Sequence, residues 1–88
     1  MRYHFDFNAL IISISQLPQE MGEPLLEQLR TGLEEQRRLL KAQLKAPGEL
    51  SFTGRSVMRQ QYLLNEALLK WLREFRGEYR SRMRSSIQ

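Results

Sequence analysis

The sequence predicts a single small domain over residues 1–88 that is mainly α-helical. In the expected fold, two antiparallel amphipathic helices are joined by a very short β-hairpin, and an N-terminal arm, either a strand or a short helix, precedes them. Three observations predict this fold: leucines at helical spacing in two long segments, a turn-rich connector between them, and an alternating pattern near the N-terminus. A chain of 88 residues has room for one modest hydrophobic core.

The first long helix is expected over residues 24–45. Pro24 suits the first turn of a helix, where its missing N–H is not needed. Five leucines share one face of the segment: Leu26, Leu29, Leu33, Leu40 and Leu44. Gln36 interrupts this apolar face, and Ala46-Pro47-Gly48 ends the helix.

The second long helix is expected over residues 57–83 and has a basic C-terminal end. Its apolar line consists of Leu64, Leu68, Trp71, Leu72, Phe75, Tyr79 and Met83. Between Tyr62 and Leu72 the apolar stripe is wider than one partner helix needs. We therefore expect the N-terminal segment to cross this stripe.

The connector over residues 49–58 is longer than the roughly 2–5 residues that join two antiparallel helices. Leu50, Phe52 and Val57 flank a Thr53-Gly54 pair that suits a turn. This pattern predicts a very small β-hairpin between the two helices.

The N-terminal arm, residues 1–22, carries two conflicting patterns. Tyr3, Phe5 and Phe7 alternate with polar residues, which indicates a strand. From Leu10 onwards the apolar spacing is helical, so a short helix is the alternative. A strand here would pair either with residues 50–52 of the same chain or with a neighbouring subunit.

The composition argues against several classes of protein. The chain has no cysteine and one histidine, His4, so neither a thiolate metal site nor a histidine-based zinc site is expected. Asp6 lies near His4, but no nucleophile accompanies them. No apolar run approaches the roughly 18–20 residues that span a membrane. We expect no enzymatic activity, no cofactor and no membrane partner.

The net charge of +4 lies at the C-terminal end. Residues 1–69 contain eight basic and eight acidic side chains, whereas residues 70–88 contain six basic side chains and only Glu74 and Glu78. The arginines expected to contact DNA or an acidic surface are Arg73, Arg76, Arg80, Arg82 and Arg84. The alternative is a solvated helix end whose positive charge suits the helix dipole.

Residues 51–59, Ser-Phe-Thr-Gly-Arg-Ser-Val-Met-Arg, resemble the connector of small phage head–tail joining proteins of the lambda protein W type. The strand matches residues 50–52, the turn matches Gly54, and Arg55-Ser56-Val57 match the step into the second helix. The resemblance extends over about residues 25–76. The hairpin is shorter than in the lambda protein, and Met58 replaces a hydroxyl residue.

The resemblance implies a non-enzymatic virion protein, synthesised in the host cytoplasm, that binds the portal protein as a homo-oligomeric ring. Such a protein helps to retain packaged double-stranded DNA and forms the platform for the tail or the next connector. The candidate partner-binding residues are Phe52, Arg55, Arg59 and Tyr79. For Arg55 and Arg59 the alternative is pairing with Glu49 and Glu66, and for Tyr79 it is a place in the core.

Two other functions suit the same sequence. The wide apolar face predicts a small helical-hairpin chaperone or co-chaperone of a secretion or assembly system. The basic end predicts a nucleic-acid-binding regulator.

Overall fold

The computed structural model describes residues 3–46, 48 and 50–87 and contains three helices, α1 (Tyr3–Ser15), α2 (Gln19–Lys45) and α3 (Phe52–Ile87). The molecule measures 56 × 21 × 16 Å. A helix of 36 residues, the length of α3, extends about 54 Å at 1.5 Å per residue. The long axis of the protein is therefore α3 itself.

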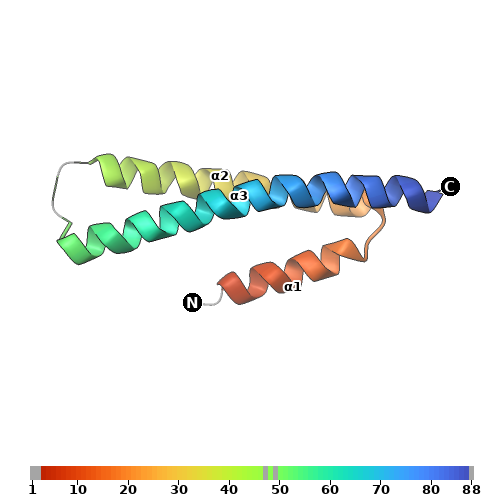
Figure 1. Cartoon of the computed structure of the whole chain (residues 1–88), viewed down its shortest axis with the longest axis horizontal. Coiled ribbons are helices and arrows are strands. Elements are labelled where there is room, and N and C mark those ends of the chain that lie inside the picture. The colour runs from red at the N-terminus through yellow and green to blue at the C-terminus, as the bar shows by residue number, and fades with distance from the viewer. Residues whose placement is uncertain (1–2, 47, 49, 88) are drawn as a thin grey trace.

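Helices α2 and α3 run antiparallel and form a long hairpin (Figure 1). Their facing sides are apolar because leucines recur every three or four residues in both. Leu26 and Leu40 of α2 are buried, as are Leu69 and Leu72 of α3. The ranges 24–45 and 57–83 lie within these helices, but α2 begins at Gln19 and α3 continues to Ile87.

Helix α1 folds back beside one half of the hairpin (Figure 1). At 13 residues it extends only about 20 Å, so it covers the half that contains the C-terminal part of α3. Ile11 and Ile14 of α1 join Leu26, Leu72 and Tyr79 in the buried core. The other half of the hairpin, which ends at the α2–α3 connector, has no third helix on it.

The prediction of a β-hairpin over residues 49–58 is wrong, because none of the residues the structure describes forms a strand. Phe52 to Met58 are the first turns of α3. The Ser51 hydroxyl accepts a hydrogen bond from the Gly54 N–H at 3.0 Å, and the Ser51 carbonyl accepts one from the Arg55 N–H at 2.9 Å. Ser51 thus caps the helix at the place where a strand was expected. Glu49 lies outside the described residues.

Of the two alternatives for the N-terminal arm, the strand is wrong for residues 3–7, which belong to helix α1; residues 1–2 lie outside the described range. Phe7, Ile11 and Ile14 lie four and three residues apart and reach the core from one side of this helix. The helical spacing therefore prevails over the alternation of Tyr3, Phe5 and Phe7, because burial against the hairpin rewards one helical face.

The turn between α1 and α2 places Pro18 at the N-cap of α2, where its carbonyl accepts the Gly22 N–H at 2.9 Å. Pro24, expected in the first turn, lies inside the helix. Because proline has no N–H, the helix lacks the hydrogen bond that residue 24 would donate to the Glu20 carbonyl.

Candidate functional site

Tyr79 anchors the junction of all three helices. Its side chain is 3% exposed, and its hydroxyl donates to the Leu17 carbonyl at 3.0 Å, with the Pro18 carbonyl 3.3 Å away. Burial is the main cause that raises the pKa of Tyr79 above its ordinary value, and the charge of Glu23 adds to it. Tyr79 was expected to bind a partner, and the structure places it inside the core of its own chain.

A row of aromatic rings continues from Tyr79 along α3. The Tyr79 and Phe75 rings stack at 6.1 Å, and the Phe75 and Trp71 rings stack at 5.3 Å. Phe7 of α1 meets Trp71 edge-on at 6.1 Å. The row thus marks the side of α3 that α1 covers, and Trp71, at 39% exposure, lies where this cover ends.

Arg76 and Arg80 are held by carboxylates of α2. Arg80 donates to both oxygens of Glu23, from Nε at 2.7 Å and from Nη2 at 3.2 Å. Arg76 donates to Glu23 at 3.3 Å and to Glu27 at 3.0 Å. These two arginines, expected to contact DNA or an acidic partner, therefore tie α3 to α2.

The ion pairs shift the titration of both carboxylates. The hydrogen bond from Arg80 is the main cause that holds the pKa of Glu23 below its ordinary value, with the charge of Arg80 and the bond from Arg76 adding to it. The hydrogen bond from Arg30, followed by that from Arg76, lowers the pKa of Glu27 to about 2. Both side chains are therefore charged at neutral pH.

A hollow of about 340 Å³ lies beside these ion pairs, between α2 and α3. Five arginines and one carboxylate contribute to its lining: Arg30, Arg37, Arg73, Arg76, Arg80 and Glu34. Most of this positive charge is compensated, since Arg30 pairs with Glu27 and Glu34, and Arg37 lies 3.8 Å from Glu66. The hollow therefore borders a network of ion pairs within the chain, and most of its positive charge is not available to an external anion.

Three of the expected arginines stay outside this network. Arg73, Arg82 and Arg84 are exposed, and no ion pair within the described part of the chain includes them. Arg82 and Arg84 lie in the last turns of α3, whereas Arg73 lies about four turns before its end and borders the hollow. The basic end therefore divides into internal and external arginines.

At the connector, Arg55 donates from Nη1 to the Leu44 carbonyl at 2.8 Å. This bond satisfies a carbonyl at the C-terminal end of α2, where the helix leaves such groups unpaired. Phe52, the neighbouring candidate, is 86% exposed. Arg55 is thus engaged within the chain, whereas Phe52 projects into solvent at the tip of the hairpin.

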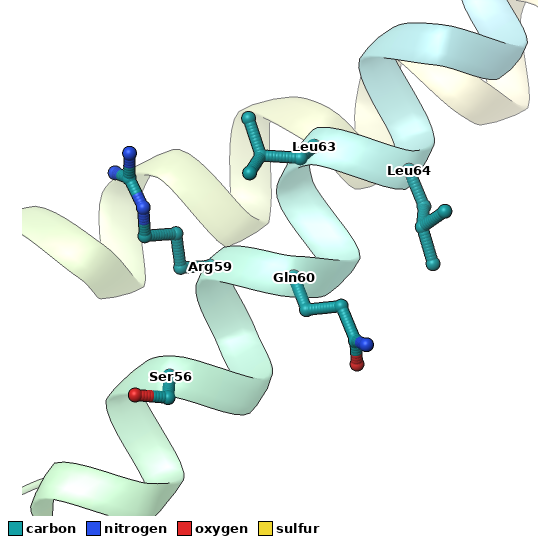
Figure 2. Close-up of a pocket in the computed structure, with 5 residues that line it drawn as sticks. All are labelled: Ser56, Arg59, Gln60, Leu63 and Leu64. Carbon is teal, nitrogen blue, oxygen red and sulfur yellow. The ribbon is translucent and has the colours of Figure 1, made fainter.

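Arg59 lies on α3, and we call the side of this helix that carries Arg59 and Leu63 the outer side. With Ser56, Gln60, Leu63 and Leu64 it lines a shallow hollow of about 390 Å³ (Figure 2). Glu66, considered as its partner, instead accepts a hydrogen bond from the Tyr62 hydroxyl at 3.0 Å and lies near Arg37. Figure 2 shows the side chains of Leu63 and Leu64 pointing away from each other, so they lie on different sides of the helix.

One polar pair interrupts the interface between α2 and α3. Asn65 is 4% exposed and donates from Nδ2 to Gln36 Oε1 at 3.2 Å. The other polar atom of the Asn65 amide, Oδ1, is buried and has no partner among the described residues. The break in the leucine pattern at Gln36 therefore corresponds to a buried amide contact.

The most prominent surface is the half of the hairpin that α1 leaves uncovered. Val57, Leu64 and Trp71 follow one another at intervals of seven residues, so they form one stripe on α3. Phe7 covers Trp71, but Val57 and Leu64 are 45% and 52% exposed. Leu39 of α2 lies about four turns beyond Leu25, a partly buried residue that packs against the core, and is 50% exposed on the same side.

We call this surface the open face and define it as Leu39, Gln43, Val57, Gln61, Leu64 and Leu68. None of these residues is charged, although 27% of the chain is. The charged residues of this part of α2 lie on other sides of the helix. Arg37, Lys41 and Lys45, spaced four residues apart, form a separate stripe. The sequence alone does not show the open face as a unit, because only the position of α1 shows which half of the hairpin stays uncovered.

Two further kinds of site are not found among the described residues. No group of three or more metal-ligating side chains gathers within the part of the chain that the structure describes. No helix there is long and apolar enough to cross a membrane. The His4 and Asp6 side chains lie outside the described set.

Comparison with known proteins finds no family model that matches the chain, no similar curated protein and no similar solved structure.

Proposed function

We propose that this protein is a non-enzymatic subunit of a protein assembly and that the open face is the surface through which it contacts other proteins. The observation that carries the proposal is the half-exposed state of Leu39, Val57 and Leu64 on a side without charges. Burying a leucine or valine side chain fully is worth roughly 1.5–3 kcal/mol, so covering three half-exposed ones provides a useful driving force.

The assembly we propose is the phage head–tail joint, with the portal protein and the next connector or tail protein as partners. The support is the resemblance over about residues 25–76, which now depends on Arg55-Ser56-Val57 and on the later leucine and tryptophan cluster. The hairpin no longer contributes, because Phe52 and Gly54 belong to α3.

The proposal is tested by deleting the gene in its source, imaging the particles, and complementing with two variants. Leu64→Glu places a charge on the open face, and Leu63→Glu places the same charge on the outer side of the same helix at nearly equal exposure, 50% against 52%. We expect full heads without tails after deletion, rescue by Leu63→Glu and no rescue by Leu64→Glu. Normal tailed particles after deletion would overturn the connector function.

The exposed arginines support a second candidate function, contact with DNA or with an acidic surface. Arg73, Arg82 and Arg84 have the charge and the exposure for phosphate contacts, which weaken steeply as salt rises. Replacing Arg82 and Arg84 by alanine should reduce DNA retention in this case and leave the fold intact. DNA retention with unchanged strength and unchanged salt dependence in the double variant would argue against it.

A further inference from the structure

We propose that a second copy of this chain covers the open face, so that the protein forms an antiparallel two-fold dimer. This inference rests on the proposed function, since it names a second copy of the chain, and not the portal protein, as the partner of the open face. Two features support this partner: the absence of charge on the face and the position of α1.

The charge distribution favours a second copy. Each copy carries a net charge of +4, so two copies repel each other unless they meet on a neutral side. The flank with Glu23, Arg76 and Arg80 is highly charged, whereas the open face offers only apolar and amide side chains. In a two-fold dimer the same face of each copy meets across the axis. A face with charges of one sign would repel its copy, whereas an uncharged face does not.

The position of α1 fixes the orientation of the two copies. Helix α1 forms an extra layer on one half of the hairpin, and packed helices lie about 8–10 Å apart (Figure 1). Two hairpins with parallel tips would bring their α1 layers against each other and hold the open faces apart. With the tips pointing in opposite directions, the open half of each copy lies next to the part of the partner's hairpin that α1 does not cover. The two open halves then form a four-helix bundle.

The length of the open half fits this arrangement. The open part of α3, from Phe52 to Lys70, is about 28 Å long, so the tip of one copy reaches the end of α1 in the other. Val57 and Leu64, 45% and 52% exposed, then meet the open half of the second copy. Phe52 lies eleven residues before Leu63, on the same side of α3 as Leu63, and stays outside this contact.

The oligomeric state of the full chain tests the proposal, measured by sedimentation from about 1 to 200 µM. We expect a dimer at the upper end, an unchanged dimer for Leu63→Glu, and at least a tenfold weaker dimer for Leu64→Glu. Far-UV circular dichroism of both variants shows whether the helices stay folded, as expected for side chains that are half-exposed. If circular dichroism shows that Leu64→Glu disrupts the helices and Leu63→Glu does not, the cross-linking experiment described next decides whether the dimer forms.

Cross-linking gives a second readout, because the chain has no cysteine of its own. Gln61 lies near the middle of the open half, so Gln61→Cys should form a disulfide-linked dimer near the two-fold axis under mild oxidation. Ser56 lies seven residues before Leu63 and so on the same side of α3 as Leu63; Ser56→Cys is the control and should stay monomeric.

Three results would overturn the dimer: a monomer at 200 µM, an oligomer equally sensitive to Leu63→Glu and Leu64→Glu, or faster cross-linking through residue 56 than through residue 61. A monomeric protein whose Leu64→Glu variant still fails to rescue particle assembly would overturn the dimer and leave the proposed function standing.

Discussion

Gly22 of α2 lies directly against the phenol of Tyr79 on α3. A Cβ atom at Gly22 would be 2.8 Å from Tyr79 Cζ and would overlap the Tyr79 hydroxyl. That hydroxyl donates to the Leu17 carbonyl, so it has no room to move without losing a buried hydrogen bond. The contact therefore fixes how closely α2 and α3 approach at the junction with α1.

Gly22→Ala should lower stability despite the better helix propensity of alanine. Overpacking costs about 1–3 kcal/mol, and the gain in helix propensity offsets at most about 1 kcal/mol of this. Urea unfolding followed by circular dichroism measures the change. Gly32→Ala and Gly77→Ala are matched controls, because a Cβ at either position meets nothing within 4 Å. They should stabilise the protein by roughly 0.5–1 kcal/mol. Equal effects of all three variants would contradict the close contact.

Tyr79→Phe extends this test, since it removes the hydroxyl and keeps the ring stacking with Phe75. The loss of the bond to Leu17 should cost about 0.5–1.5 kcal/mol. In the Tyr79→Phe background, Gly22→Ala should cost less than it does alone, because part of the overlap involves the missing hydroxyl. Strict additivity of the two changes would show that the residues do not touch.

Acid should destabilise the junction through Glu23 and Glu27. Both have lowered pKa values in the folded protein, that of Glu27 to about 2, so the unfolded chain binds more protons as the pH falls. Their stabilising contribution is complete above the ordinary glutamate value of 4.5 and is lost as the pH falls toward 2. Urea midpoints should decrease from pH 6 to pH 3. Glu23→Gln should lower the midpoint at pH 6 and flatten this decrease; an unchanged slope would exclude Glu23 as a source.

How far the sequence predicts this structure depends on how local each signal is. The leucines between 26 and 44 repeat within one helix, so their spacing alone predicts a long amphipathic segment. Arg76 and Glu23 are 53 residues apart, and no local pattern shows that an arginine expected at a surface is held internally. The same holds for Tyr79, whose burial depends on where α1 folds back.

The β-hairpin was predicted wrongly, and the N-terminal arm was left open between a strand and a helix, for a related reason. Near the N-terminus, the alternation of Tyr3, Phe5 and Phe7 competes with the helical spacing of Phe7, Ile11 and Ile14, and only contact with the hairpin decides between them. At the connector, Ser-Phe-Thr-Gly is compatible with a turn and with a capped helix start. Ser51 three residues before Gly54 is the local signal that identifies the cap.

Ser51→Ala tests this corrected connector. The serine hydroxyl satisfies the Gly54 N–H, one of the N–H groups that the start of α3 leaves without a helical partner. Its loss should cost about 0.5–2 kcal/mol and should increase amide hydrogen exchange in the first turn of α3. Ser51→Asp retains a capping oxygen and adds a favourable charge at the helix N-terminus, so it should preserve or raise stability. Ser56→Ala, inside α3, is the control and should change stability by less than about 0.5 kcal/mol. A β-turn at Thr53-Gly54 predicts no gain from aspartate at residue 51 and no helical exchange protection of the Arg55 N–H, which in α3 bonds to the Ser51 carbonyl.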